Sequence, residues 1–312
     1  MFGQPGADRD RARGALLGTF VGDALGMPFE GAAATDIPAR VEMVAARRGR
    51  GTYTDDTQMM IALGESLLEL DRVDEEHLAR AFLDAFDPAR GYGSGTIELF
   101  QLWRQGVPVT EAATRLYGGA GSLGNGAAMR IAPIAVRFAH SGSRLRAEAE
   151  RSARLTHSHA LAVDAAVVQA TAVAAAFRDG GVLGAARAAA NTAVMREQLD
   201  HAAALLAAGC DPEEVGARLG NSPEGHRSVP AAIVAAVSQP RFEQAVTFAV
   251  RCGGDTDTLG AMAGAIAGAS NGATAIPRRW LDALEHGQKG RRHVAQLAEA
   301  LAGRRSAGGR AR

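Results

Sequence analysis

The sequence predicts an all-α protein, on the basis of its composition and the helical spacing of its apolar residues. Hydrophobic residues make up 47% of the 312 residues, but many of them are alanine, and only 5% are aromatic. Ala, Leu, Glu, Arg and Met favour helices, whereas few segments are rich in the residues that favour strands. A chain of this length buries a sizeable core. We expect one compact domain over residues 1–302 and a disordered basic tail over 303–312.

The first expected helix covers residues 8–25 and carries a glycine at every fourth position. These glycines are Gly14, Gly18 and Gly22. Each costs a helix about 1 kcal/mol relative to alanine, so their repetition indicates that a neighbouring backbone approaches closely. A helix expected over residues 257–270 has the same spacing at Gly260, Gly264 and Gly268. We interpret the pattern as a tight helix–helix crossing.

The other helices are expected where apolar residues recur at helical spacing. Their ranges are 54–70, 78–86, 97–104, 129–138, 158–177, 185–208, 212–219, 229–237, 242–250, 278–285 and 294–301. Segments rich in glycine, proline and small polar residues predict loops at 26–31, 91–95, 117–126 and 221–230. The residues that could carry chemistry lie in these loops and at helix starts, where functional sites are usually built.

Charge and cysteine usage limit the functional classes. The formal net charge is +0, which excludes a global basic field for non-specific nucleic-acid binding. Cys210 and Cys252 lack the spacing of a metal site and fit a reducing compartment. No apolar signal-peptide core follows the N-terminus, and residues 259–269 are too short and too rich in glycine for a membrane span. We therefore expect a cytoplasmic monomer without membrane association.

Two acidic clusters stand at the starts of expected helices. They are Thr54-Asp55-Asp56-Thr57 and, after Gly253-Gly254, Asp255-Thr256-Asp257-Thr258. Taken singly, most such clusters cap a helix. Brought together, four carboxylates would repel one another unless cations joined them. Their hard oxygen ligands suit Mg²⁺ or Mn²⁺ rather than zinc, and a pair of ions sharing the acids is a reasonable hypothesis.

Six ordered motifs resemble the ADP-ribosylglycohydrolase family, which includes dinitrogenase-reductase-activating glycohydrolase. The two acidic clusters are similar to the family's signature motifs. Residues 14–18, Gly22-Asp23 and Glu30 resemble its first helix and acidic loop. The segments RGYGSG (90–95), GSLGNGAAMR (121–130) and LTHS (155–158) resemble the branch that cleaves serine-linked and polymeric ADP-ribose. The likeness covers most of the chain, and the combination is far more specific than any one motif.

This resemblance implies an orthogonal helical bundle with two Mg²⁺ ions, for which Mn²⁺ is a possible substitute. It implies that the metal ligands are Glu30, Thr54, Asp55, Asp56, Asp255, Asp257 and Thr258. Glu30 matches the family's mobile glutamate, which contacts metal and acts in acid/base chemistry. Glu30, Asp55 and Asp56 form the expected catalytic set, and the carboxylate that transfers the proton is left open.

The glycine-rich loop over residues 121–126 can turn several backbone N–H groups toward an anion such as pyrophosphate. An ordinary flexible loop is equally compatible with this stretch, and the resemblance favours phosphate binding. Tyr117 matches an aromatic residue that stacks on adenine, and His157 matches a ligand-contacting histidine. The implied substrate-binding residues are Gly91, Gly93, Tyr117, Gly121, Ser122, Leu123, Gly124, Asn125, Gly126 and His157.

The chain departs from the family pattern at two places. Leu123 stands where the branch has a second aromatic residue, which leaves adenine stacking to Tyr117. Residues 220–228 align with another ligand-facing segment but contain Pro223, His226 and Arg227 instead. We assign no contact to these three residues.

The expected function is Mg²⁺-dependent hydrolysis of the C1″ glycosidic bond of ADP-ribose. Serine-linked ADP-ribose on protein is the first expected substrate, with poly(ADP-ribose) and O-acetyl-ADP-ribose as others. One alternative is a metal-dependent phosphohydrolase, because paired metals on carboxylates serve that chemistry equally well. Another is a non-catalytic ADP-ribose-binding protein, against which the intact acidic clusters and Glu30 argue.

Overall fold

The computed structural model describes residues 5–46 and 48–304, which form helices almost throughout and confirm the all-α fold class. The α-helices are α1 (Pro5–Gly26), α2 (Asp55–Leu70), α3 (Glu75–Ala85), α4 (Ser94–Arg104), α5 (Val109–Arg115), α6 (Gly126–Met129), α7 (Ala132–Arg137), α8 (Gly142–Arg154), α9 (Ala160–Phe177), α10 (Val182–Ala189), α11 (Ala193–Ala208), α12 (Pro212–Arg218), α13 (Gly225–Ser238), α14 (Phe242–Arg251), α15 (Thr256–Asn271), α16 (Arg278–Ala283) and α17 (Arg291–Gly303).

Short elements complete the chain. The 3-10 helices are η1 (Met27–Phe29), η2 (Ala34–Asp36), η3 (Pro88–Arg90), η4 (Leu116–Gly119) and η5 (Ala273–Ala275). Strands β1 (Ala45–Ala46) and β2 (Gly49–Arg50) pair in antiparallel register and form a small hairpin that the sequence pattern does not predict. Apart from Gly303 and Arg304, the tail expected over 303–312 lies outside the described residues.

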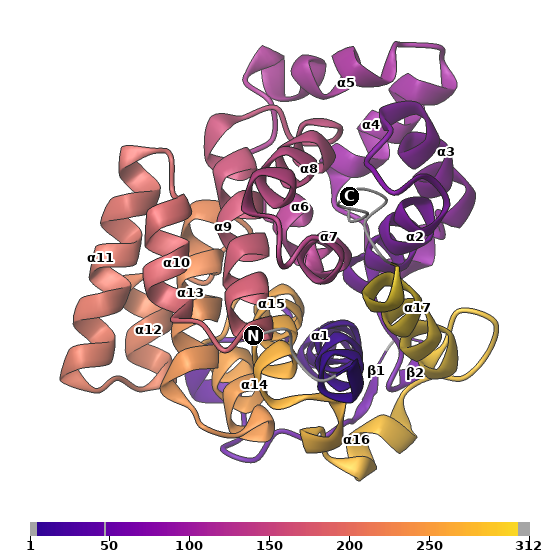
Figure 1. Ribbon diagram of the computed structural model, residues 1–312. Coiled ribbons are helices and arrows are strands. Elements are labelled where there is room, and N and C mark those ends of the chain that lie inside the picture. The colour runs from indigo at the N-terminus through magenta and orange to yellow at the C-terminus, as the bar shows by residue number, and fades with distance from the viewer. Residues whose placement is uncertain (1–4, 47, 305–312) are drawn as a thin grey trace, which may run out of the picture.

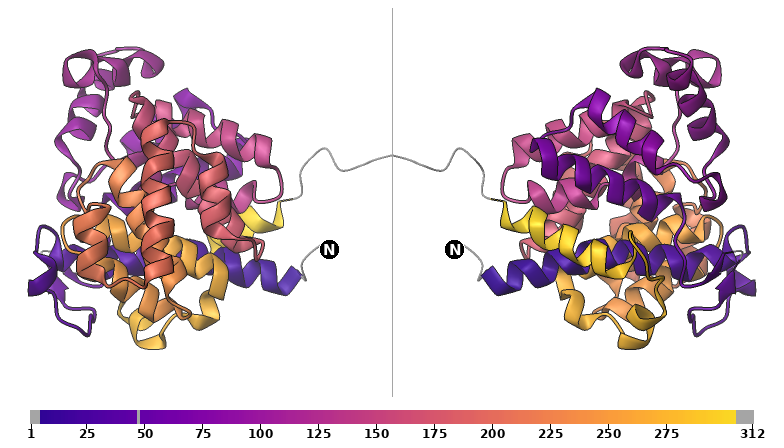
Figure 2. Two further views of the ribbon diagram at one scale, coloured as in Figure 1. Left: turned by 90° about the vertical axis from the view of Figure 1, so that its left-hand side faces the viewer. Right: turned by 90° about the vertical axis from the view of Figure 1, so that its right-hand side faces the viewer.

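The expected tight crossing is the contact between α1 and α15, which lie side by side in the centre of the molecule (Figures 1 and 2). A Cβ atom added at Gly18 would lie 2.1 Å from the carbonyl oxygen of Gly264, and one added at Gly22 would lie 1.9 Å from that of Gly260. These distances leave no room for a side chain. The glycine spacing therefore allows two backbones to touch, as predicted, and brings the end of α1 beside the start of α15.

Helix α9 forms another central element of the core (Figure 1). It is long and apolar enough to pass a length-and-composition test for a membrane span, with a mean hydropathy of 1.8. Buried residues make up 83% of this window, as they do in the central helix of a globular core. Among the described residues only α9 passes this test, and residues 259–269 in α15 do not.

Several predicted elements differ from the observed ones. Helices α5 and α8 have no counterpart in the prediction, because α5 has only seven residues and α8 is mostly polar, with Leu145 as its one large apolar buried side chain. The helix predicted over 129–138 is observed as α7, which begins at Ala132 with Pro133 in its first turn, where a missing N–H is tolerated; Met129 instead ends the separate short helix α6. The predicted 185–208 helix divides before Thr192, whose side chain accepts from the N–H of Met195 and starts α11. Conversely, α13 begins at Gly225 within the predicted loop and continues through Pro230.

Candidate active site

A buried carboxylate at the end of α1 organises the start of α2. Asp23 is fully buried, and its oxygens accept hydrogen bonds from the Thr54 N–H at 3.0 and 3.1 Å, the Thr57 N–H at 3.1 Å and the Thr57 hydroxyl at 2.6 Å. The Thr54 hydroxyl accepts from the Asp56 N–H at 3.4 Å. The first turn of α2 is therefore capped by Asp23 and Thr54, so Asp55 and Asp56 are not needed for capping.

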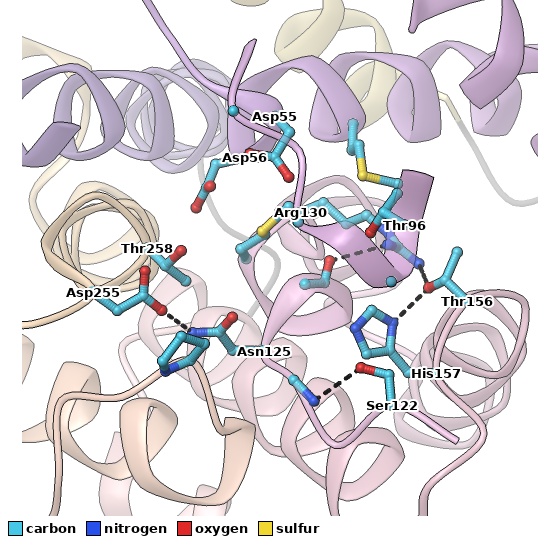
Figure 3. A pocket seen from close by; sticks show the side chains of 18 of the residues that line it. Asp55, Asp56, Thr96, Ser122, Asn125, Arg130, Thr156, His157, Asp255 and Thr258 are labelled. Atoms are coloured by element: carbon cyan, nitrogen blue, oxygen red, sulfur yellow. Dashed lines mark hydrogen bonds between the residues drawn. The ribbon is translucent and has the colours of Figure 1, made fainter. Parts of the chain in front are cut away.

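In the second acidic cluster, the side chain of the first carboxylate, Asp255, also does not cap its helix. Asp255 occupies the N-cap position of α15, but its side chain makes no capping hydrogen bond. It accepts instead from the Asn125 side chain at 2.6 Å, across the cavity wall (Figure 3). Gly254 precedes it with a φ of +70°, and a Cβ atom there would lie 2.3 Å from the Asn221 carbonyl oxygen. A glycine is required at this turn, as the sequence pattern predicts.

Glu30 is joined to the second cluster through the backbone. It follows η1, and its side chain is exposed at the edge of the cavity. The N–H of Gly31 donates to the Gly254 carbonyl at 2.8 Å, and the N–H of Gly254 donates to the Ala32 carbonyl at 2.9 Å. Because two hydrogen bonds hold this loop against the turn before Asp255, Glu30 is placed beside both acidic clusters.

The acidic clusters meet around one cavity, where they repel one another. Figure 3 shows Asp55 and Asp56 facing Asp255 and Thr258. Burial and the neighbouring carboxylates raise the pKa of Asp55 to about 8. Burial and the same kind of repulsion raise the pKa values of Asp56 and Asp257 well above the ordinary range. The site therefore concentrates more negative charge than its protein surroundings balance.

The chemistry of these side chains fits divalent cations. Oδ1 of Asp56 is buried and has no hydrogen-bond partner among the described residues, so an acceptor atom is left for a cation. In that part of the chain, no three acidic, histidine or cysteine side chains already converge at the spacing of a bound ion. Mg²⁺ does not require such convergence, because it keeps several waters and is usually bound through one or two carboxylates. The oxygen-only donor set fits Mg²⁺ or Mn²⁺ better than zinc.

The structure brings most of the sequence-predicted site residues to this cavity. Its lining includes Glu30, Asp55, Asp56, Gly91, Gly93, Tyr117, Ser122, Gly124, Asn125, Gly126, His157, Asp255, Asp257 and Thr258. Three predicted residues do not line it: Thr54, Gly121 and Leu123. Thr54 caps α2, the N–H of Gly121 donates to the Leu116 carbonyl, and the Leu123 carbonyl accepts from Gly225.

Tyr117 stands at the open side of the cavity. It is 59% exposed, and its φ of +53° is in the left-handed region, which is uncommon for a residue other than glycine. Its hydroxyl end lies so close to Gly95 that a Cβ atom there would be 2.5 Å away. An exposed aromatic side chain held by this unusual backbone is available to stack on a flat ligand group.

Comparison with known proteins identifies the family. The family model described as ADP-ribosylglycohydrolase matches residues 4–310. The chain belongs to the ADP-ribosylglycohydrolase family. It is thus a hydrolase of glycosidic bonds.

Individual members of the family match over most of their length. The ADP-ribosylhydrolase ARH3 of Danio rerio is 33% identical over 86% of this chain and 85% of its own. The ADP-ribosyl-[dinitrogen reductase] glycohydrolase of Rhodospirillum rubrum is 29% identical over 94% and 95%. A solved structure described as an ADP-ribosylglycohydrolase-related protein complex superposes with a TM-score of 0.78 at 30% identity, covering 95% of this chain and 98% of that one.

Sequence reasoning assigned no role to three buried residues of this glycohydrolase. Asp23 caps α2, and Arg130 and Thr156 lie beside His157 and line the cavity. All three fall within motifs that resemble the family. For Asp23 and Arg130 the available signal was a charged residue in an otherwise apolar or glycine-rich segment, because a charge buried there needs partners. Thr156 gave no such signal.

Proposed function

We propose that this glycohydrolase hydrolyses the C1″ glycosidic bond of ADP-ribose in a Mg²⁺-dependent reaction. The observation that carries the proposal is the meeting of Glu30 with two acidic clusters at one end of a cavity whose other wall is the glycine-rich loop. The acidic end suits a ribose held through cations, and the loop suits a diphosphate. We further propose serine-linked ADP-ribose on protein as the main substrate, supported by the resemblance of residues 90–95 and 121–130 to the branch of the family that cleaves this linkage.

The size of the cavity indicates how such a ligand would lie. Its volume is about 240 Å³, below the roughly 300–1,000 Å³ that encloses a drug-sized ligand. ADP-ribose would therefore extend beyond the enclosed part, and exposed Tyr117 stands at the rim to receive the adenine. The distal ribose would occupy the acidic end, where Asp55, Asp56 and Asp257 lie.

Within this mechanism, the acidic residues would hold the cations, and Glu30 would also transfer a proton. Bound Mg²⁺ supplies charge neutralisation and an anchor for the ribose hydroxyls, and Asp55, Asp56, Asp255, Asp257, Thr258 and Glu30 are the residues that would hold it. Glycoside hydrolysis passes through an oxocarbenium-like transition state. Glu30 would protonate the leaving oxygen or take the proton from the attacking water, because it is at the exposed edge where the leaving group departs.

The first test is the variant Glu30→Gln, which keeps the shape of the side chain and removes its proton transfer. We expect turnover of an ADP-ribosylated serine peptide to fall by at least about 100-fold, the usual contribution of general acid–base catalysis, while ADP-ribose binding measured by calorimetry survives. Normal turnover in this variant would remove Glu30 from the mechanism.

The products distinguish the proposal from its main alternative. Release of intact ADP-ribose supports glycosidic cleavage, whereas AMP would indicate a phosphohydrolase that uses the same carboxylates. Binding without any product would indicate a non-catalytic ADP-ribose-binding protein. A panel of serine-linked, arginine-linked, polymeric and acetylated substrates, with Mg²⁺ and with chelator, would test the linkage and the metal dependence together.

A further inference from the structure

A fully buried arginine lies beside the cavity and has no carboxylate hydrogen-bond partner among the described residues. Arg130 donates to the carbonyl oxygens of Gly126 at 3.0 Å and Ser152 at 2.9 Å, and to the Thr156 hydroxyl at 2.8 Å. Its guanidinium carbon lies 4.8 Å from the centroid of the Phe82 ring. Burial lowers its pKa to about 9, which still leaves it charged at neutral pH. A guanidinium only donates hydrogen bonds, so each of these contacts has a known direction.

The direction of the Arg130 hydrogen bond determines which group donates in the hydrogen bond between Thr156 and His157. Oγ1 of Thr156 accepts from Arg130 and lies 2.7 Å from Nδ1 of His157 (Figure 3). If Nδ1 carried the proton, the hydroxyl would accept twice and its own hydrogen would lack an acceptor among the described residues. The hydroxyl therefore donates to Nδ1, and a neutral imidazole that accepts at Nδ1 carries its proton on Nε2.

The protonated nitrogen faces the glycine-rich loop. A Cβ atom added at Gly126 would lie 3.2 Å from Nε2 of His157, and one added at Gly124 would lie 3.5 Å away. His157 lines the cavity, and no hydrogen bond within the described part of the chain uses its Nε2. An N–H donor is thus directed toward the space beside the loop, where its hydrogen-bonding capacity is unused by the protein.

We propose that Arg130 and Thr156 are positioning residues that hold His157 in the Nε2–H tautomer, as a fixed neutral donor for a diphosphate oxygen of ADP-ribose. This inference rests on the proposed function for the identity of the ligand, but not for the tautomer. The tautomer is set in the ligand-free protein, so the ring does not need to reorganise when the ligand binds. It also selects an acceptor over a donor at that point of the ligand, because a donor would leave two N–H groups facing each other.

The tautomer is measured on the ligand-free protein by nitrogen NMR of the histidine side chains. The chain has eight histidines, and the signals that disappear in His157→Gln identify those of His157. At neutral pH, in the wild type and in Thr156→Ser, we expect the nitrogen–proton couplings of His157 to be those of a neutral ring that is protonated at Nε2. A ring protonated at Nδ1, a mixture of both tautomers or an imidazolium in the wild type would overturn the proposal, whatever the enzyme's substrate.

The functional consequence is tested with a matched pair of variants. Thr156→Val keeps the shape of the side chain and removes the hydroxyl, and Thr156→Ser keeps the hydroxyl. We expect ADP-ribose, titrated by calorimetry, to bind the valine variant about tenfold more weakly and the serine variant like the wild type, because one hydrogen bond to a charged group is worth about 1.5 kcal/mol or more.

Each outcome separates the inference from the proposed function. Equal affinity in the wild type and in a folded valine variant whose NMR shows a relaxed tautomer would overturn the positioning role. If the valine variant does not fold, the wild-type tautomer measured by NMR still decides the first part. Failure of the wild type to bind ADP-ribose, with the Nε2–H tautomer observed, would contradict the proposed ligand and leave the tautomer assignment standing.

Discussion

At the scale of single residues, the site depends on buried charges whose partners come from other helices. Asp23 from α1 caps α2, Asn125 before α6 holds Asp255 before α15, and Arg130 acts on His157 through Thr156. Each partner is separated from its target by tens or hundreds of residues, except for Thr156 and His157. The position of each reactive group is therefore set by hydrogen bonds that exist only in the folded chain.

Asp23 supports a test of this arrangement. The carboxylate of Asp23 accepts hydrogen bonds from Thr54 and Thr57. In Asp23→Asn an NH₂ group replaces one of the two oxygens, so a donor would face the N–H groups of these threonines. We expect a loss of about 2–3 kcal/mol in the free energy of unfolding, the cost of buried unsatisfied groups, measured by urea unfolding. Asp179→Asn, at a surface carboxylate paired with Arg11, is the control and should change stability by less than about 1 kcal/mol. Similar small losses in both variants would contradict the capping role.

His157 predicts a pH dependence of stability. Burial and the neighbouring Arg130 charge lower the pKa of His157 to about 3 from its ordinary value of 6.5. Below pH 6.5 the unfolded chain binds a proton that the folded protein does not bind until pH falls to about 3. Stability contributed by the neutral ring is therefore fully present above pH 6.5 and is lost as pH falls from 6.5 toward 3.

The variant His157→Gln isolates this effect, because other groups titrate alike in both proteins. Between about pH 6 and 4, urea unfolding of the wild type should lose about 1.4 kcal/mol more per pH unit than unfolding of the variant, as expected for one proton. Parallel pH profiles of the two proteins would show that His157 titrates normally in the folded state.

At the scale of elements, the contact between α1 and α15 brings the two acidic regions together. The glycines of both helices let the backbones touch along their length, and the contact continues to Gly26, whose carbonyl accepts from the Thr256 hydroxyl at 2.8 Å. Asp23 near the end of α1 and Asp257 at the start of α15 both lie at this end of the contact, where a Cβ atom added at Gly26 would lie 2.6 Å from the Cα of Asp257. A small shift along the contact would therefore move one acidic cluster relative to the other.

The contact predicts a sharp difference between two Gly→Ala variants. In Gly18→Ala the new methyl would collide with the Gly264 backbone, and we expect a loss of about 3 kcal/mol or more in the free energy of unfolding. Gly184→Ala in α10 adds a methyl where no atom lies within 4 Å, and it should be neutral or stabilising by up to about 1 kcal/mol. Thermal and urea unfolding of both variants would check the pair, and equal stabilities would refute the close contact.

At the scale of the whole molecule, the cavity is lined by segments that are spread along the chain from Glu30 to Thr258. Its wall takes residues from the loop after η1, the start of α2, the segment before α4, the glycine-rich loop, the segment before α9 and the start of α15. Repulsion among the buried carboxylates opposes this assembly, so a ligand that neutralises them should stabilise the entire fold.

This balance leads to a prediction for divalent cations. Saturating Mg²⁺ should raise the thermal midpoint of the wild type, and chelator should reverse the rise. When the free ion is 100-fold above its dissociation constant, the expected gain in the free energy of unfolding is about 2.7 kcal/mol. Asp257→Ala should lose most of the response, whereas Asp282→Ala, at an exposed surface carboxylate, should retain it. An identical response in the two variants would argue against the acidic clusters as the metal site.

The sequence alone determined the all-α class, the glycine contact and the pair of acidic clusters, because these depend on local propensity and on residue spacing. Its element boundaries were less accurate where polar α8 and the break before Thr192 carried little hydrophobic signal. Spacing indicated that the Thr54 cluster could cap a helix, but it could not show that Thr54, Gly121 and Leu123 do not line the cavity or that Asp23, Arg130 and Thr156 support it. Only the tertiary structure decided those points, because a buried polar atom takes its partner from whatever the fold brings within hydrogen-bond distance, regardless of separation along the chain.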